Sequence, residues 1–376
     1  MNLPYYLQHT DYWVAALCVI SLLIQIVYYF FVYLRVGLYT HHTPKQEQSV
    51  PVSIIICARN EADNLLSNLP SILTQDYPNY EVIVVNDCSS DNTFEILGTF
   101  KKQYPHLKFT TIEENYKFRH GKKLALTVGI KAASNEWLLL TDADCKASSN
   151  QWIRHMQQEM TDNKDIVLGY GGFHAQRGLL NNIIRYDSFF IALQYFGLAL
   201  CGKAYMGVGR NLAYRKSLFF KNNGFASHIK IPCGDDDLFV NETATRHNTA
   251  IVICPESHTR CEAKNTWSEW VEQKSRHLSS SFQYKFSTKS ILSLEILSRI
   301  VFYASSAYLV ITGSYFPYAI APLILRLAIQ YFVFIAASSK MKEKHLWYPG
   351  PFYDFFLILF YMYIFLSKFI AAKYNK

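Results

Sequence analysis

The sequence lacks several patterns that mark familiar protein classes. Its eight cysteines form no CxxC pair, so the ligand spacing of a zinc site is absent. Unpatterned thiols of this kind are typical of a reducing compartment, and Cys18 and Cys57 are best explained as small buried hydrophobes. No long Lys/Arg run accompanies the net charge of +8, which argues against a nucleic-acid partner. Internal repeats and low-complexity tracts are also absent, which excludes repeat architectures.

What the sequence does contain is apolar residues, concentrated at its two ends. The 376 residues are too many for one ordinary domain and enough for one globular domain plus membrane segments. Residues 12–34 carry no charge before Arg35, and about 20 apolar residues span a bilayer. Because no small-residue cleavage site follows, we expect an anchor rather than a signal peptide.

Further apolar segments lie towards the C-terminus. Residues 291–313 and 315–337 predict two spans joined by a tight turn near Ser314 and Pro317. Residues 352–370 predict a third span, with a surface helix as the alternative. An earlier apolar stretch, residues 178–200, contains Arg185 and Asp187 and therefore predicts an amphipathic or interfacial helix instead of a span.

Positive charges beside these segments predict the topology. Arg35 and Lys45 flank the first span, and Lys340, Lys342 and Lys344 follow the apolar segment over residues 315–337. Excess Lys and Arg marks cytoplasmic loops and explains much of the net charge. We therefore expect a multi-pass protein of a bacterial inner (plasma) membrane, with its central domain in the cytoplasm. The expected divisions are an anchor over 1–40, a globular domain over 50–290 and a membrane region over 291–376 with two or three transmembrane helices.

In the central domain, short β-branched runs alternate with helical patterns. The patterns predict strands over 51–57, 80–86, 108–111 and 137–140, and helices over 61–74, 93–102 and 121–133. This alternation implies parallel strands in an α/β sheet, where ligands bind at the carboxyl ends of strands. Polar clusters follow three of the expected strands, at Asn60–Glu61, Asn86–Asp87 and Asp142–Asp144. We therefore expect these clusters to form one site.

Asp142 and Asp144 follow the apolar run WLLL, with one residue between them. Two carboxylates on a turn suit a hard divalent cation such as Mg²⁺ or Mn²⁺, which usually keeps diphosphate oxygens in its shell. Such an ion would offset charge on a leaving nucleoside diphosphate. The alternative is a solvated acidic turn, but the position after a fourth buried strand favours a metal site.

The stretch from Asn86 to Thr93 is a second acidic turn at a strand end. Asp87 could accept hydrogen bonds from a ribose or from the edge of a uracil ring. Asp87 and Asp91 could equally cap the next helix. The residues alone leave both interpretations open.

Three consecutive carboxylates, Asp235, Asp236 and Asp237, follow Gly234. They repel one another, so one of them has a raised pKa or needs a cation nearby. A carboxylate is also a suitable general base for an acceptor hydroxyl. Capping of the next helix explains Asp235 or Asp237 equally well, and only one of the three need be catalytic.

Basic residues that could hold phosphate lie at two places. Lys122 opens a predicted helix, whose N-terminus can bind phosphate, whereas Lys123 is expected to be an ordinary solvated lysine. Gln273 and Arg276 share a helix face, and Arg276 could contact a diphosphate through two hydrogen bonds. His277 could touch phosphate or acceptor. The alternative for this second group is a basic interfacial helix before the membrane.

A short glycine-containing loop runs from Gly207 to Asn211. Its small residues would let a ligand approach the backbone closely. An ordinary connecting loop explains it equally well.

Taken together, these segments resemble the inverting family 2 glycosyltransferases with a GT-A fold, which include cellulose and hyaluronan synthases. VSIIICARNEADNL is similar to the family's first strand and Asn-Glu turn, NDCSSDNT to its nucleotide-recognition element, and GKKLAL to its stretch near the diphosphate. DAD stands where the metal triplet stands, GDDD resembles the segment with the general base, and QKSRH resembles the Gln-x-x-Arg-Trp motif. The resemblance covers about residues 50–290, flanked by membrane helices as in membrane-bound members.

The resemblance implies a GT-A nucleotide-sugar-binding (Rossmann-like) domain with a mixed, largely parallel sheet, and a role for each matching residue. The implied roles are general base for Asp236, with Asp235 beside it; nucleotide binding for Asn60, Glu61, Asp87, Lys122 and Asp142; metal binding for Asp144 and Asp142; and diphosphate or acceptor contact for Gln273, Arg276 and His277.

The implied reaction is transfer of a sugar, with inversion, from a nucleotide sugar (expected to be a UDP-sugar) to a lipid-linked or growing glycan acceptor, with Mn²⁺ or Mg²⁺. His277 stands where the motif has the tryptophan that packs on the acceptor in processive synthases. Its replacement, and the few C-terminal spans, favour transfer of one or a few sugars. A polyprenyl-phosphate sugar synthase and a non-catalytic nucleotide-sugar-binding membrane subunit remain as alternatives.

Overall fold

The four predicted strands lie side by side in the computed structural model, in one parallel set. They are β1 (Val52–Ala58), β2 (Tyr80–Asp87), β3 (Leu107–Ile112) and β4 (Trp137–Asp142). β1 pairs in parallel with both β2 and β4, and β2 pairs in parallel with β3. The register sets Ala58 opposite Asn86 and Cys57 opposite Asp142. The carboxyl ends of β1, β2 and β4 therefore meet at one edge of the sheet, as the sequence predicts.

Three more strands extend this sheet, and three form a smaller one. The large sheet has the order β3-β2-β1-β4-β8-β6-β9, with β6 (Ile166–Gly169), β8 (Leu212–Arg215) and β9 (Thr249–Val252). β8 is antiparallel to both of its neighbours, so the sheet is mixed but largely parallel, which confirms the prediction. The small sheet has the order β5-β10-β7, with β5 (Cys145–Ala147), β7 (Gly171–Phe173) and β10 (Thr259–Cys261).

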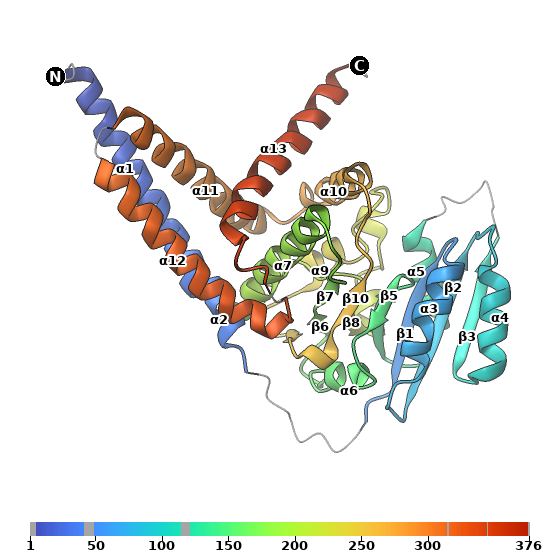
Figure 1. Ribbon diagram of the computed structural model, residues 1–376. Coiled ribbons are helices and arrows are strands. Elements are labelled where there is room, and N and C mark those ends of the chain that lie inside the picture. The colour runs from blue at the N-terminus through green and yellow to red at the C-terminus, as the bar shows by residue number, and fades with distance from the viewer. Residues whose placement is uncertain (1–4, 41–48, 114–120, 314–315, 344, 375–376) are drawn as a thin grey trace. The chain divides into compact units, whose positions relative to one another are not determined.

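Helices cover both faces of the parallel strands. They are α3 (Ala62–Leu73), α4 (Thr93–Gln103), α5 (Lys122–Ala132) and α6 (Trp152–Gln157) (Figure 1). Successive side chains of a strand point to opposite faces. Ile54 and Ile56 accordingly join α3, α4 and α6 in one buried core, while Ile55 meets α5. At the α5 contact a Cβ on Gly129 would lie 2.7 Å from the Ile55 side chain, so only glycine allows this close approach.

The remaining helices of the α/β unit are α7 (Leu179–Leu200), α8 (Lys216–Lys221), α9 (Asp237–Thr243) and α10 (Trp267–Ser281), with short 3₁₀ turns at Ala226–His228 and Pro255–Ser257. α7 has the length and composition of a membrane span, but 78% of its most apolar segment is buried inside the structure. Its buried Asp187 forms an ion pair with Lys274 of α10. Most side chains of α7 are thus used in protein packing.

The structure describes residues 5–40, 49–113, 121–313, 316–343 and 345–374, and the chain divides into two compact units. Tyr39–Tyr284 form the α/β unit, and Met1–Leu38 with Lys285–Lys376 form a helical unit. The predicted linker residue Lys45, the turn residue Ser314 and the topology marker Lys344 lie outside the described residues.

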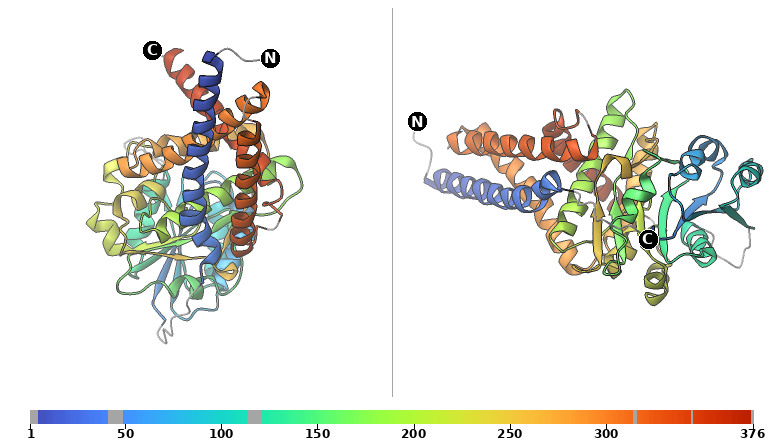
Figure 2. Two further views of the ribbon diagram at one scale, coloured as in Figure 1. Left: turned by 90° about the vertical axis from the view of Figure 1, so that its left-hand side faces the viewer. Right: turned by 90° about the horizontal axis from the view of Figure 1, so that it is seen from below.

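The helical unit contains α1 (Tyr5–Tyr28), a π-helical turn (Tyr29–Tyr33), α2 (Leu34–Leu38), α11 (Phe286–Thr312), α12 (Phe316–Met341) and α13 (Gly350–Tyr374). Among the described residues of this unit, four stretches are long and apolar enough to span a membrane: Thr10–Leu38, Phe286–Thr312, Phe316–Met341 and Gly350–Ser367. α1 packs against α11 and α12 (Figure 2). Pro317, expected in a turn, lies instead in the first turn of α12, where proline is tolerated because its missing N–H has no helical acceptor.

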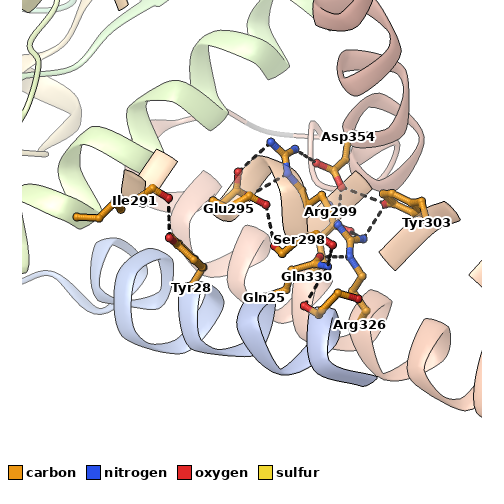
Figure 3. A network of polar contacts seen from close by, with 11 residues as sticks. Gln25, Tyr28, Ile291, Glu295, Ser298, Arg299, Tyr303, Arg326, Gln330 and Asp354 are labelled. Atoms are coloured by element: carbon orange, nitrogen blue, oxygen red, sulfur yellow. Dashed lines mark hydrogen bonds and ion pairs between the residues drawn. The ribbon is translucent and has the colours of Figure 1, made fainter. Parts of the chain in front are cut away.

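A buried polar network joins these helices (Figure 3). Arg326 of α12 donates to Gln25 of α1, to Tyr303 of α11 and to Asp354 of α13. Arg299 of α11 donates to the other carboxylate oxygen of Asp354, at 2.6 Å. Charged groups persist in an apolar environment when they pair with one another. Arg326 of α12 therefore connects to the three other helices, and Asp354 pairs with both arginines.

Candidate active site

Two predicted nucleotide-binding turns lie against each other at the carboxyl edge of β1 and β2. The backbone N–H of Asn60 donates to Ser89 Oγ at 2.9 Å, and Asn60 Oδ1 accepts from the Ser90 N–H at 2.8 Å. Asn60 has a φ of 57°, a left-handed conformation that asparagine tolerates better than most residues. The turn after β1 and the turn after β2 thus form one surface.

The three acidic residues beside this surface have different environments. Asp91 accepts from the backbone N–H groups of Ala62 and Thr93, the first residues of α3 and α4, although Asn92 occupies the N-cap position of α4. Asp87 is buried at the end of β2. Glu61 accepts from the side-chain amide of Asn64, and partial burial raises the pKa of Glu61. Asn60, Glu61 and Asp87 therefore come together as the sequence predicts, although their role in nucleotide binding stays a prediction.

Lys122 connects the predicted metal triplet to the predicted base segment. Its Nζ lies 2.7 Å from Asp142 Oδ1 and 3.3 Å from Asp235 Oδ2. Burial would lower the pKa of Lys122, but the two carboxylates outweigh burial and raise it well above its ordinary value. Two motifs almost a hundred positions apart in the chain therefore belong to one site.

Lys123 differs from its expected role as a solvated lysine. Its side chain is buried, and Nζ donates to the backbone oxygens of His228 and Ile231 at 2.6 and 2.9 Å. Burial lowers the pKa of Lys123. Successive helical residues are about 100° apart around the axis, so Lys122 faces the site while Lys123 faces the protein. The prediction for Lys123 was wrong because it ignored this geometry.

The Asp142–Asp144 pair has the chemistry of a hard-cation site. Burial, and then the charge of Asp142, raise the pKa of Asp144 to about 6. Burial also acts against ionisation of Asp142, but Lys122 outweighs it and lowers the pKa of Asp142. Two carboxylates that repel each other on one turn provide oxygen ligands whose repulsion a divalent cation would relieve. The residues fit Mg²⁺ or Mn²⁺.

The three carboxylates after Gly234 have three different environments. Asp237 is buried and accepts from Ser280 Oγ and the Tyr284 hydroxyl, so it is structural. Asp236 Oδ2 accepts from the Gly209 N–H at 2.7 Å. Burial, then the charges of Asp235 and Asp237, raise the pKa of Asp236 to about 7, which suits a general base.

The helix cap within this triplet differs from the capping alternative. That alternative named Asp235 or Asp237, but Asp236 is the N-cap residue of α9, with Oδ1 accepting from the Asp237 N–H at 2.7 Å. The three positions of a continuous acidic run cannot be distinguished by residue type. Only the backbone conformation decides which one precedes the first helical turn.

The QKSRH segment lies on α10, which begins with a capping box formed by Thr266 and Glu269. Cys233 donates to the backbone oxygen of Arg276 at 3.0 Å, which ties α10 to the acidic segment. Gln273 is partly exposed, and Arg276 is exposed. His277 keeps contact with solvent, but desolvation and then the charges of Lys274 and Arg210 lower its pKa, so the imidazole is neutral at pH 7.

Two features of the site escaped the sequence analysis. Cys145, directly after Asp144, forms a disulfide with Cys261 of β10, 116 positions away. The interpretation of the cysteines as unpaired thiols was wrong for this pair, which becomes visible only when β5 and β10 are aligned. The second feature is Arg210, in the Gly207–Asn211 loop. Its charge favours the ionised form of both Asp142 and Asp144, although burial and the charge of Asp142 still keep the pKa of Asp144 raised. The glycine content of the loop was the only signal for it.

Residues 53–220 match the glycosyl transferase family 2 model. They form a family 2 glycosyltransferase domain. A poly-beta-1,6-N-acetyl-D-glucosamine synthase of Staphylococcus epidermidis is 38% identical to the chain over 119 residues, which are 31% of the chain and 28% of that synthase. Glycosyltransferase AglE of Haloferax volcanii is 34% identical over 141 residues, which are 37% of the chain and 44% of AglE. The chain thus matches less than half the length of these curated relatives.

A solved structure shares the fold of this domain and its flanks. The mannosyltransferase PcManGT of Pyrobaculum calidifontis, in complex with GDP-Man and Mn²⁺, aligns with a TM-score of 0.58 over 89% of this chain and 99% of that one. The sequences are 20% identical, so the likeness concerns the fold. The α/β unit has the GT-A fold that the sequence predicts.

Proposed function

We propose that the chain is a membrane glycosyltransferase, a hexosyltransferase that moves a sugar from a nucleotide sugar to a lipid-linked or growing glycan acceptor with inversion. The observation that carries this proposal is the position of Lys122 between Asp142 and Asp235. It supports a site that combines a carboxylate pair for a metal with the acidic segment that contains the candidate base. The family 2 domain and the polysaccharide-synthase relatives support it.

On the donor side, the turns that carry Asn60, Glu61 and Asp87 bind the nucleoside, for which we propose uridine. Asp144, together with Asp142, holds Mn²⁺ or Mg²⁺, and the Mn²⁺ named for PcManGT supports this choice. When bound, the ion offsets the negative charge that develops on the leaving nucleoside diphosphate.

On the acceptor side, Asp236 takes the proton of the acceptor hydroxyl. The hydrogen bond from the Gly209 N–H fixes one oxygen of this carboxylate, and the hydrogen bond from the Asp237 N–H fixes the other. The deprotonated hydroxyl attacks the anomeric carbon as the bond to the diphosphate breaks, which inverts the configuration. Lys122 and Arg276 stabilise the departing diphosphate, with Gln273 and His277 beside it.

The membrane segments complete the proposal. An anchor over 1–40 and a membrane region over 291–376 hold the 50–290 domain at a bacterial inner membrane, on the cytoplasmic side. A membrane position gives this domain access to a lipid-linked acceptor.

The class of reaction is tested by a donor screen on the detergent-solubilised full chain. Release of nucleoside diphosphate is followed with a panel of UDP- and GDP-sugars, in Mn²⁺ and then in a chelator, with and without a crude lipid extract as acceptor. Metal-dependent release from one donor supports the proposal and identifies the sugar. No release from any donor under any condition contradicts it and points to a nucleotide-sugar-binding subunit.

A further inference from the structure

Arg210 presents an enclosed guanidinium that the proposed reaction has not yet used. Its Nη1 atom is shielded from solvent and has no hydrogen-bond partner among the residues that the structure describes. The guanidinium carbon lies 4.4 Å from the centre of the Phe173 ring, which leaves the edge of the guanidinium available for hydrogen bonds. An enclosed N–H group without a partner is costly unless a ligand or water satisfies it.

The backbone around Arg210 is fixed on both sides. The backbone oxygen of Arg210 accepts from Thr259 Oγ1 at 2.8 Å, and the N–H of Gly209 donates to Asp236 at 2.7 Å. A Cβ on Gly171 would lie 2.9 Å from the Arg210 Cβ, so glycine at 171 makes room for this side chain. Arg210 is therefore held directly beside the residue that donates to the proposed base.

The loop also lies against the other charged groups of the site. A Cβ on Gly209 would lie 3.3 Å from Lys122 Nζ and 3.4 Å from Asp236 Oδ2. Lys122 itself is engaged by Asp142 and Asp235. Arg210 thus has a buried donor atom, Nη1, from which no described residue accepts a hydrogen bond.

We infer that Arg210 is a donor-binding residue whose guanidinium hydrogen-bonds the diphosphate of the nucleotide sugar. This inference rests on the proposed function and adds a residue outside the motifs that carry the family resemblance. A planar guanidinium matches phosphate oxygens with two parallel N–H groups, which an ammonium cannot do. Stacking on Phe173 holds that plane in place before the donor arrives.

The test compares nucleotide binding by full-length, detergent-solubilised variants. Titration calorimetry in Mn²⁺ gives the dissociation constants of UDP and GDP, and competition against the tighter of the two gives that of the matching nucleoside. Arg210→Gln should weaken diphosphate binding roughly ten- to hundredfold and leave nucleoside binding unchanged. Arg210→Lys should recover only part of the loss. Arg154→Gln, which removes an equal charge from an exposed position on α6, should change neither constant.

Thermal melting and steady-state kinetics separate the remaining outcomes. The assignment is overturned if Arg210→Gln folds and binds the nucleoside diphosphate with a dissociation constant within twofold of that of the unchanged chain. A raised KM for the acceptor with unchanged diphosphate affinity overturns it as well. If Arg210→Gln does not fold, Arg210→Lys decides: full affinity with lysine excludes a need for the guanidinium. Lack of nucleotide binding by the unchanged chain would contradict the proposed function itself, a result distinct from the failure of Arg210 alone.

Discussion

Lys122 donates a 2.7 Å hydrogen bond from Nζ to Oδ1 of Asp142. The bond joins a proposed metal ligand to a cation that we propose stabilises the departing diphosphate. The ammonium and a divalent cation therefore compete for the same carboxylate, since both are attracted to its charge. Entry of the metal would release Lys122 towards the phosphate.

Replacing Lys122 with Met should therefore have two opposite effects. Mn²⁺ should bind several-fold more tightly, because the site loses a positive charge beside Asp142. Transfer should fall by about tenfold or more, because the departing diphosphate loses a cation. Electron paramagnetic resonance of free Mn²⁺ measures metal binding, and the rate of nucleoside diphosphate release measures transfer, both on one preparation. Weaker Mn²⁺ binding in Lys122→Met would show that Lys122 supports the metal site instead of competing with it.

The pH dependence of transfer follows from Asp236, whose pKa is raised to about 7. A general base works only when deprotonated, so kcat/KM should rise tenfold per pH unit below about 7 and level off above it. A divalent cation bound nearby would shift the midpoint downwards, because its charge favours the ionised carboxylate. A profile that is flat between pH 5 and 8 would exclude Asp236 as the base in the rate-limiting step.

The Cys145–Cys261 disulfide should stabilise the α/β unit. It closes a loop of 116 positions, for which chain-entropy arguments give about 3–5 kcal/mol at most. A reductant should therefore lower the melting temperature of the unchanged chain by several degrees. The variant with Ser at both positions should melt lower from the start and show no response to reductant. Equal melting temperatures for all samples would mean that the bond contributes nothing.

The polar network of the helical unit makes a further prediction. Asp354→Asn removes the carboxylate that pairs with both Arg299 and Arg326. Each of these two buried guanidinium groups then lacks the negative charge of Asp354. We expect about 3–5 kcal/mol of destabilisation, because a buried ion pair that loses one partner leaves an uncompensated charge. Urea titration in detergent measures it, with Leu359→Met at an exposed position of the same helix as control. A change below about 0.5 kcal/mol, the range of surface substitutions, would show that the network is not stabilising.

The sequence predicted the parts of the site that depend on local order. The apolar runs before Asn60, Asn86 and Asp142 gave parallel strands, and parallel strands place their polar ends at one edge. The direction in which the Lys123 side chain points was not predicted, because it depends on the exact residue at which α5 begins. The Cys145–Cys261 bond and the position of Arg210 depend on which strands pair across the small sheet, and a strand pattern does not contain that information.

The most direct test compares Asp144→Ala and Asp236→Asn with the unchanged chain, using the donor found in the screen. Both variants should lose diphosphate release, by roughly 10²–10⁴-fold for Asp236→Asn. Only Asp144→Ala should also lose Mn²⁺-dependent nucleotide binding, while Asp236→Asn should bind the donor nearly as well as the unchanged chain. Full activity in either variant, or loss of donor binding in both, would contradict a site in which Asp144 holds the metal and Asp236 is the base.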